Sequence, residues 1–508
     1  MIALKDQNVL ILGLGVSGLS MARWCARCGA HVSVTDTRPS PPQLELLRRE
    51  VPQATFFCSP LDTSLLEEKV FDAVLKSPGL SPVMTAALVS ACDKKSIKFS
   101  NELELFVIAL ADLKTQRAYA PTVLAITGTN GKTTVTALTG HLITRAKKTV
   151  AVAGNIGPTL LDTLTARLDA GDLPEIWVME LSSFQLEGVQ GFEPNAATVL
   201  NITQDHLDWH GSLAAYIAAK ARIFGKQSKM LVNRNDPLVL ALVPAASQQS
   251  RAKHRPAVDY ETFGDDMPTR PGDFGLEEVS GMVWLVRALQ ADGTYRRRRR
   301  SEAAEDLFIQ RLLPMDALRI RGRHNAVNAL AALSLASSAG CSMASLLFGL
   351  REYAGEPHRV ESIAVVNGIE FFDDSKGTNV GATVAALKGL GVDRNIVLIL
   401  GGEGKGQDFS PLMLPVSRFA AAVVLIGRDA QLIRTVLSSI DLPMLNARTM
   451  LEAVTLAFDQ ARPGDAVLMS PACASFDMFD NYAHRAAMFR EAVALIAHNA
   501  NVDLVALS

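Results

Sequence analysis

The sequence predicts an α/β protein of three domains, each a doubly wound and mostly parallel β-sheet. At 508 residues the chain is too long for one hydrophobic core. Its composition, 48% hydrophobic and 20% charged with 35 glycines, is that of an ordinary α/β protein. Short apolar runs end in glycine or polar residues and lead into helix-like segments, a pattern typical of β-α-β units. We place the domains at residues 1–112, 113–355 and 356–508: a Rossmann-like domain, a central domain like a P-loop ATPase, and a second Rossmann-like domain.

The charge balance points to neither nucleic acid nor membrane as a partner. Lys and Arg number 50 against 52 Asp and Glu, so the formal net charge is −2. No apolar run reaches the length of a membrane span. The apolar segment Val9–Leu19 is broken by three glycines, which is the wrong pattern for an export signal. We therefore expect a cytoplasmic protein with no nucleic-acid partner and no membrane insertion.

The first domain opens with a dinucleotide-type glycine turn. Asn8–Leu12 is predicted to be a strand, Gly13–Gly18 a tight turn, and Leu19–Arg27 the helix that follows. The next strand, His31–Asp36, ends in an acid. This is a GxGxxG pattern in a β-α-β setting, and its default ligand would be NAD or FAD.

Residues after two strands of this domain change that expectation. Thr37 and Arg38 offer a hydroxyl and a guanidinium, which suit a phosphate or a nucleotide base. The third strand, residues 73–76, ends in Ser77-Pro78-Gly79 at the same sheet edge. Taken alone, Ser77-Pro78-Gly79 is most simply a plain turn.

The central domain begins with a phosphate-binding loop. Val123–Ile126 is predicted to be a buried strand, and Thr127–Thr134 leads from it into a helix. Glycines let backbone N–H groups approach phosphate oxygens, and the helix N-terminus adds positive potential. Lys132 can bridge the terminal phosphates, and the Thr133 hydroxyl can reach a magnesium ion. The spacing differs from the usual P-loop, which has four residues between its two glycines, whereas two separate Gly128 from Gly131. The alternative, an ordinary strand–turn–helix connection, does not explain the Gly-Lys-Thr-Thr sequence.

Other strands of the central domain also end in polar residues. Asn155 and His206 each follow a predicted strand, and Glu180 ends one. Carboxyl ends of parallel strands meet at one edge of a sheet, so these side chains should lie near the phosphate loop. Glu180 is the natural magnesium carboxylate. His206 would alone be a surface histidine, but Asp205 and Asp208 beside it favour function. From spacing alone Lys220 is a solvated lysine in a helix.

The region from 251 to about 315 is less informative. It contains one clear strand, residues 282–286, and a run of five arginines from Arg296 to Arg300. The arginines could form a polyphosphate or nucleic-acid patch. A solvated loop is the better interpretation, because no aromatic residues interleave with them. Asn325 and Asn328 follow on one face of an alanine-rich helix, where capping or a surface position would explain them.

The third domain repeats the architecture. Strands predicted at residues 369–373, 395–400, 421–426 and 465–469 indicate another doubly wound sheet. Polar segments follow three of them: Asp374–Asn379, Gly401–Lys405 and Ser470–Phe476. A triphosphate site flanked by two such domains suits a reaction that joins a nucleotide-like substrate, ATP and a third molecule. In such a reaction ATP activates a carboxylate as an acyl phosphate, which an amine then attacks. Because the intermediate hydrolyses in water, the domains would have to close around it.

A series of motifs in this order resembles the Mur ligases. They are Thr127–Thr134, Gly154–Gly157, Glu180–Leu186, Asp205–Asp208, His324–Ala329, His358-Arg359 and Asp374–Asn379. The glycine turn, Ser77–Gly79 and Ser470–Ser475 are most similar to one branch, the MurD family. The resemblance covers nearly the whole chain except residues 265–315, which look like an enlarged loop. It implies an ATP-dependent amide ligase of peptidoglycan precursor synthesis that joins D-glutamate to UDP-N-acetylmuramoyl-L-alanine through an acyl phosphate, and we expect a monomer.

The resemblance also implies a role for each matching residue. Lys132, His206 and Lys220 would be catalytic. One Mg²⁺ would be bound by Thr133 and Glu180, and a second by His206 with Lys220 as a carbamate. ATP would contact Gly128, Thr129, Asn130, Gly131, Lys132, Thr133, Thr134, Asn325, Asn328, Arg359 and Asp374. The UDP part of the substrate would be held by Gly15, Val16, Ser17, Asp36, Thr37, Arg38, Ser77 and Gly79, and its muramoyl part by Asn155. D-glutamate would be placed by Lys376, Thr378, Lys405, Ser475, Phe476 and Tyr482.

The sequence departs from the MurD pattern at a few positions, and other readings stay open. Glu403 stands where the family usually has aspartate, and Phe476 and Tyr482 stand where it often has leucine and phenylalanine. These changes affect the shape of the amino-acid pocket and leave the reaction class alone. The nearest rivals are another Mur ligase or a folylpolyglutamate synthetase. More distant ones are a nicotinamide-dependent oxidoreductase and a nucleotide-gated switch protein without catalysis.

Overall fold

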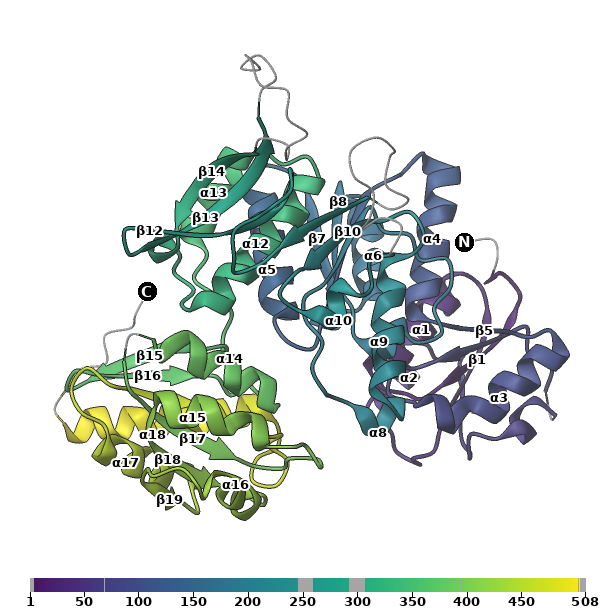
Figure 1. Cartoon of the computed structure of the whole chain (residues 1–508). Coiled ribbons are helices and arrows are strands. Elements are labelled where there is room, and N and C mark those ends of the chain that lie inside the picture. The colour runs from purple at the N-terminus through teal and green to yellow at the C-terminus, as the bar shows by residue number, and fades with distance from the viewer. Residues whose placement is uncertain are drawn as a thin grey trace.

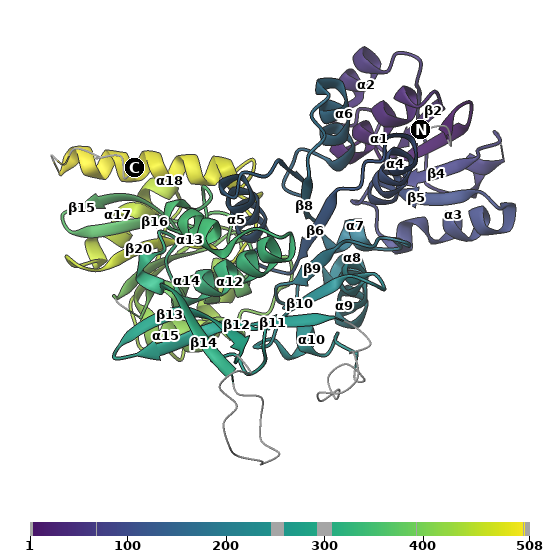
Figure 2. The same ribbon diagram turned by 90° about the horizontal axis from the view of Figure 1, so that it is seen from above.

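The computed structural model describes residues 4–67, 69–244, 259–291, 307–392, 394–500 and 502. The solvated loop predicted for the run Arg296–Arg300 lies outside these residues. Three parallel or mostly parallel sheets confirm the predicted α/β class, and the C-terminal one stands apart from the other two in Figure 1. Figure 2 shows the chain from above, with the N-terminal sheet at the upper right. None of the helices in the described ranges has the length and hydropathy of a membrane span.

The N-terminal sheet has five parallel strands in the order β3-β2-β1-β4-β5. The strand order reverses beside β1, so a crevice forms at its carboxyl end, where the glycine turn lies. The strands are β1 (Asn8–Leu12), β2 (His31–Asp36), β3 (Thr55–Cys58), β4 (Ala73–Lys76) and β5 (Lys98–Asn101). The helices are α1 (Val16–Arg27), α2 (Leu44–Glu50), α3 (Pro82–Lys95) and α4 (Glu102–Arg117).

The central sheet has six parallel strands in the order β11-β10-β9-β6-β8-β7. The phosphate loop leaves β6, which lies inside the sheet and is buried on both faces. The strands are β6 (Thr122–Thr127), β7 (Val150–Gly154), β8 (Ile176–Glu180), β9 (Ala196–Val199), β10 (Lys229–Asn233) and β11 (Tyr260–Phe263). The helices are α5 (Lys132–Arg145), α6 (Leu160–Ala170), α7 (Ser183–Leu186), α8 (Leu207–His210), α9 (Leu213–Ala221), α10 (Pro237–Leu240), α12 (Arg323–Ser338) and α13 (Met343–Glu352).

A three-stranded antiparallel sheet, which the sequence did not predict, follows the central sheet. It consists of β12 (Phe274–Val279), β13 (Met282–Gln290) and β14 (Leu307–Pro314). Only part of β13 was expected. β14 is mostly half-exposed and its apolar residues do not alternate clearly, so pairing with β13 rather than local pattern makes it a strand. Its inner side packs on α12 through Phe274, Leu285 and Leu313.

The C-terminal sheet has the order β15-β16-β20-β17-β18-β19, with only β15 antiparallel. Its two hydrophobic clusters contain no residue of the other two sheets. The strands are β15 (Glu361–Val366), β16 (Ile369–Asp373), β17 (Ile396–Gly401), β18 (Ala420–Ile426), β19 (Met444–Asn446) and β20 (Ala466–Met469). The helices are α14 (Val380–Leu390), α15 (Met413–Phe419), α16 (Ala430–Leu437), α17 (Met450–Gln460) and α18 (Tyr482–Asn499).

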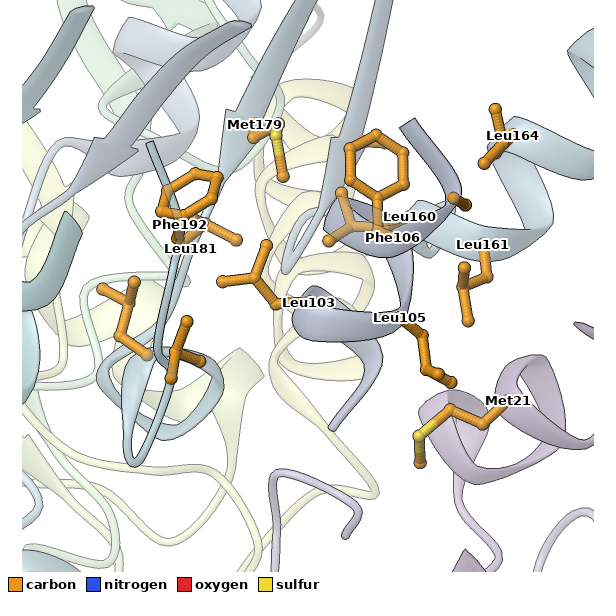
Figure 3. Close-up of a cluster of buried hydrophobic side chains, with 14 of the residues drawn as sticks. Met21, Leu103, Leu105, Phe106, Leu160, Leu161, Leu164, Met179, Leu181 and Phe192 are labelled. Carbon is orange, nitrogen blue, oxygen red and sulfur yellow. The ribbon is translucent and has the colours of Figure 1, made fainter. Parts of the chain in front are cut away.

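The N-terminal and central sheets share one hydrophobic core, unlike the C-terminal sheet. Side chains of α1, α4, α6 and β8 interdigitate between them, among them Met21, Leu105, Leu161 and Met179 (Figure 3). The ring of Phe106 meets the edge of Trp177 at 4.9 Å between centroids. Helix α4 runs across the predicted domain boundary at 112 and 113 and belongs to both packing units. The domain limits stay a prediction.

Candidate active site

The phosphate loop connects β6 to α5 and requires its glycines. Gly128 and Gly131 have φ angles of +155° and +83°, which L side chains rarely adopt. Lys132, the first residue of α5, is folded back onto the loop, where its Nζ donates to the carbonyl oxygens of Gly128 and Thr129 at 2.9 Å each. Burial lowers the pKa of Lys132, and the charge of Glu180 opposes that shift. The ammonium group is thus held at the mouth of the loop by bonds that a phosphate can replace.

Glu180 ends β8 next to this loop and is almost completely buried. Its Oε1 accepts a hydrogen bond from Asn155 Nδ2 at 2.8 Å, whereas Oε2 has no hydrogen-bond partner. A buried carboxylate oxygen without a partner is costly, which indicates that a ligand completes the site. The Thr133 hydroxyl is a second hard oxygen donor on the same edge. Thr133 and Glu180 therefore fit a Mg²⁺ ion bound with the phosphates.

Lys220 and His206 flank the loop from α9 and from the start of α8. The Nζ of Lys220 donates to Gly128 O at 2.8 Å and lies 4.5 Å from the centroid of the Tyr216 ring. Burial, and then the charge of Lys132, hold the pKa of Lys220 well below its ordinary value. His206 adopts a φ of +54° and lies 3.5 Å from Asp205. As an ammonium, Lys220 has no lone pair to offer a metal ion, and Mg²⁺ prefers oxygen ligands to an amine nitrogen, so the pair fits Mg²⁺ only with a modified lysine.

A cavity of about 670 Å³ lies between the N-terminal and central sheets. Asp36 accepts the N–H of Leu14 at 2.8 Å and two bonds from the Arg38 guanidinium, which holds the pKa of Asp36 down at about 2. Ser77 Oγ donates to the carbonyl oxygen of Gly13 at 2.7 Å and joins two of the turns. The walls include all nine residues predicted for the UDP-linked substrate: Gly15, Val16, Ser17, Asp36, Thr37, Arg38, Ser77, Gly79 and Asn155.

Sequence reasoning assigned no ligand contact to several further wall residues of this cavity. Leu61 lies beyond β3, and nothing in the local sequence marks it. Thr159, Ser182, Phe184 and Gln185 come from the central sheet. The last three stand directly after the end of β8, and that position is a signal that the sequence does carry.

A second cavity, of about 280 Å³, lies between the central and C-terminal sheets. Asp374 is buried there and accepts from Ser470 Oγ at 2.7 Å, and burial raises the pKa of its carboxyl to about 7. The predicted ATP residues in its wall are Asn130, Gly131, Thr134, Asn325, Asn328, Arg359 and Asp374. The other predicted ATP residues, Gly128, Thr129, Lys132 and Thr133, lie in the loop itself. Residues that sequence reasoning missed include Asn201, Asn233, Asn235, Asp265 and Glu356, of which the first two stand at or just after strand ends.

Two polar contacts join the C-terminal sheet to the phosphate loop. Arg359 Nη2 donates to Thr133 Oγ1 at 2.6 Å, and Asn379 Nδ2 donates to Asn130 Oδ1 at 3.1 Å. Because the C-terminal sheet has its own cores, these contacts hold it near the loop without a shared hydrophobic core.

The residues predicted for D-glutamate lie at the carboxyl edge of the C-terminal sheet. Lys376 Nζ lies 5.2 Å from the Tyr482 ring centroid, and Lys405 Nζ lies 5.6 Å from that of Phe476. Lys376 also lines the smaller cavity, and burial lowers its pKa. Thr378 follows Lys376 in the loop after β16, and Ser475 is buried in the loop after β20. The six residues therefore share an edge, as two cation–aromatic pairs and two loop residues.

Buried Arg485, which sequence reasoning missed, holds these two loops together. Its Nη1 donates to Cys473 O at 3.1 Å and its Nη2 to Ser375 O at 2.8 Å. Spacing on α18 gives no hint of this role. The unusual acid Glu403 forms an ion pair with Arg428 at 2.9 Å on the same edge.

Another group of metal-ligand types, His358, Glu361 and Asp373, lies nearby. The Arg490 guanidinium is 2.5 Å from Glu361 and 3.6 Å from Asp373, so a cation is already present. His358 Nδ1 lies 2.7 Å from Asp373 Oδ2. We interpret the group as a structural ion cluster that holds the segment leading to Arg359.

Comparisons with known proteins point to one family. The chain matches the family models "Mur ligase MurD-like, N-terminal domain" at residues 7–98, "Mur ligase middle domain" at 126–268 and "Mur ligase, glutamate ligase domain" at 358–473. A protein of Albidiferax ferrireducens named UDP-N-acetylmuramoylalanine--D-glutamate ligase is 63% identical over 97% of both chains. A protein of the same name from Ralstonia nicotianae is 54% identical over 99% of both.

Solved structures share the fold at lower identity. The UDP-N-acetylmuramate-alanine ligase MurC of Thermotoga maritima matches with a TM-score of 0.53 and 20% identity, covering 97% of this chain and 100% of that one. The MurF ligase of the same organism, in complex with ADP, matches with a TM-score of 0.55 and 16% identity, covering 97% and 96%. From the three family models and the full-length relatives, we conclude that the chain belongs to the Mur ligase family, in its MurD-like branch.

Proposed function

We propose that the chain is the ligase that adds D-glutamate to UDP-N-acetylmuramoyl-L-alanine at the expense of ATP, in peptidoglycan precursor synthesis. The relatives that match over nearly their full length bear this name. The alanine carboxylate attacks the γ-phosphorus of ATP, ADP leaves, and an acyl phosphate forms. The amine of D-glutamate then attacks the acyl carbon, and phosphate leaves as the amide bond forms.

One observation carries the proposal: Asn155, a wall residue of the larger cavity, is linked through Glu180 to the phosphate loop beside the smaller cavity. Asn155 lines the larger cavity and donates to Glu180, and Glu180 acts on the charge of Lys132. The loop that holds Lys132 forms a wall of the smaller cavity. A carboxylate presented beside Asn155 would therefore be close to the terminal phosphate of a nucleotide in the smaller cavity. An oxidoreductase or a nucleotide switch would not require this arrangement.

The protein groups around the transfer point have separate tasks. Lys132 would exchange its two loop carbonyls for phosphate oxygens, and it would stabilise the charge that develops during transfer. Arg359 donates to Thr133 and would bring a second cation to the same phosphates. Mg²⁺, held by Thr133 and Glu180, would neutralise the phosphate charge when bound.

The proposed modification of Lys220 explains its unusual position. Burial favours the neutral amine, and a neutral amine can react with CO₂ to give a carbamate and a proton. The carbamate would supply the oxygen ligand that the ammonium cannot, for a second Mg²⁺ shared with His206. The Lys220→Ala variant should then lose activity and regain part of it with small carboxylic acids. Indifference to those acids would argue for a plain lysine.

For the amino acid, we propose the predicted set on the C-terminal sheet. Lys376, Lys405 and the hydroxyls of Thr378 and Ser475 suit a dicarboxylate, because they offer cations and donors on one edge. The position of Lys376 in the wall of the smaller cavity supports an approach of the amine from that side. A monomeric state and a cytoplasmic location stay predictions.

The test is phosphate release with UDP-N-acetylmuramoyl-L-alanine, ATP and D-glutamate, with each omitted in turn. We expect release only when all three are present. A panel with L-alanine, L-lysine and diaminopimelate in place of D-glutamate separates the other Mur ligases. Turnover of one of these with no turnover of D-glutamate would assign the chain a different amino acid. Tight NADH binding without UDP-sugar binding would favour an oxidoreductase.

A further inference from the structure

Glu102 is a buried carboxyl group for which the proposed reaction has no use. It is the first residue of α4, and only 2% of it is exposed. Its Oε1 accepts hydrogen bonds from Ser20 Oγ and from the Leu161 N–H, both at 3.2 Å. The Ser17 side chain interacts with the same carboxyl. The three partners lie on two different helices, α1 and α6.

These partners connect opposite walls of the larger cavity. Ser17 is itself a wall residue, and Ser20 lies one turn further along α1. On the other side Thr159 is a wall residue, and its Oγ1 donates to Ser20 Oγ at 2.8 Å. Glu102 therefore holds the glycine turn of the N-terminal sheet and the loop after β7 at a constant separation. Met21 and Leu103, the chain neighbours of Ser20 and Glu102, belong with Leu161 to the hydrophobic cluster shown in Figure 3.

The residue before Glu102 contacts a third wall. Asn101 Nδ2 donates to the backbone carbonyl of Gln185, another residue that lines the cavity. The junction of β5 and α4 thus contacts Gln185 directly and reaches Thr159 through Ser20. A carboxylate at the N-terminus of α6 is also favourable, because the Leu161 N–H has no acceptor within its own helix and the helix dipole attracts negative charge there.

We propose that Glu102 is a positioning residue for the UDP-linked substrate: it sets the width of the larger cavity through Ser20, Ser17 and Leu161. Glu102 does not line the cavity itself and contacts the wall segments from the side that faces away from the cavity. The inference rests on the proposed function for the identity of the ligand. Burial raises the pKa of Glu102 to about 7, and the charge of Asp162 adds to the rise. The position of this carboxyl therefore carries a desolvation cost.

The test compares Glu102→Leu with Glu102→Gln. Leucine leaves the Ser20 and Leu161 donors without an acceptor, whereas the glutamine Oε1 can still accept both. We expect Glu102→Leu to raise the KM for UDP-N-acetylmuramoyl-L-alanine about tenfold, the effect of losing buried hydrogen bonds to a carboxyl. The kcat and the KM for ATP should stay within about twofold, and Glu102→Gln should stay near the wild type.

A matched control lies two residues away on the same helix. Glu104 is a carboxylate in the first turn of α4, and it accepts from Ser100 Oγ and the Gln190 N–H. The Glu104→Gln variant should leave the KM for the UDP-linked substrate unchanged. If Glu102→Leu does not fold, Ser20→Ala removes one of the two bonds and should raise the same KM about threefold.

Calorimetry with UDP and with ADP, in the absence of turnover, separates the possible failures. Weaker UDP binding by Glu102→Leu with unchanged ADP binding supports the proposal. Unchanged UDP binding, or equal losses of UDP and ADP affinity, overturns it and leaves Glu102 a residue of general structure. A wild-type protein that binds no UDP would refute the proposed substrate instead.

Discussion

Replacement of Gly389 by alanine should weaken closure of the nucleotide cavity without destabilising the fold. Gly389 lies on α14, and a Cβ atom there would be 2.6 Å from both Cε1 and Nδ1 of His324. His324 is a half-buried residue in the wall of the smaller cavity, and its ring Nδ1 is enclosed. Ala382, Ala385 and Ala386 of the same helix form part of that wall. The added methyl group should therefore push α14 and the C-terminal sheet away from the nucleotide.

The size of the effect follows from the packing. Overfilling a packed contact costs about 1–3 kcal/mol, and a shift of about 1–3 kcal/mol between two states changes an affinity about 5- to 150-fold. The C-terminal sheet has its own cores, so it can relieve the strain by moving as a unit. Alanine is also the better helix former, by about 1 kcal/mol. We expect the KM for ATP to rise at least about fivefold while the melting temperature hardly changes.

The assay is phosphate release at varied ATP, with thermal unfolding measured on the same samples. Lys388→Ala is the control, because Lys388 is the exposed neighbour of Gly389 on α14. UDP binding should be unaffected in both variants, since the larger cavity lies between the other two sheets. A fall of many degrees in melting temperature with an unchanged KM for ATP would refute the reasoning, and so would an equal rise in the KM for the UDP-linked substrate.

Three further predictions concern other parts of the molecule. Lys132→Met should lower kcat by at least about 10²-fold, with UDP affinity unchanged in calorimetry; parallel losses would contradict the separation of the two sites. Phe106→Ala should lower the free energy of unfolding by about 3–5 kcal/mol in urea titrations, because the ring is fully buried against Trp177. The raised pKa of Asp374, about 7, means that the fold favours the protonated carboxyl, so this group's contribution to stability declines as pH rises from about 4 to 7. Asp374→Asn should remove that part of the pH dependence of the melting temperature, and an unaltered profile would count against it.

Much of the site could be predicted from the sequence because its signals are local. Most of the functional segments are apolar strands followed directly by glycine or polar residues, and parallel strands deliver such segments to one edge. For this reason all nine residues predicted for the UDP-linked substrate line one cavity. The glycines at 128 and 131 are needed for backbone angles within the loop itself, so the loop can be recognised from its own residues.

Other features depend on contacts between distant segments and have no local signal. The bond between Arg359 and Thr133 joins residues that are 226 positions apart. β14 is a strand because β13 pairs with it, and Arg485 braces two loops from inside a helix whose sequence shows no sign of this.

The fold class, the phosphate loop and the strand ends that carry the candidate site could be predicted from local sequence, because backbone geometry and strand periodicity act over a few residues. Which strand ends share a cavity depends on how the sheets pack in the folded chain. The tertiary structure also showed that α4 serves two sheets, that Glu180 keeps an unpartnered oxygen, and that Glu102 is buried behind the larger cavity. These properties arise from desolvation and packing between segments far apart in the chain, and no short stretch of sequence records them.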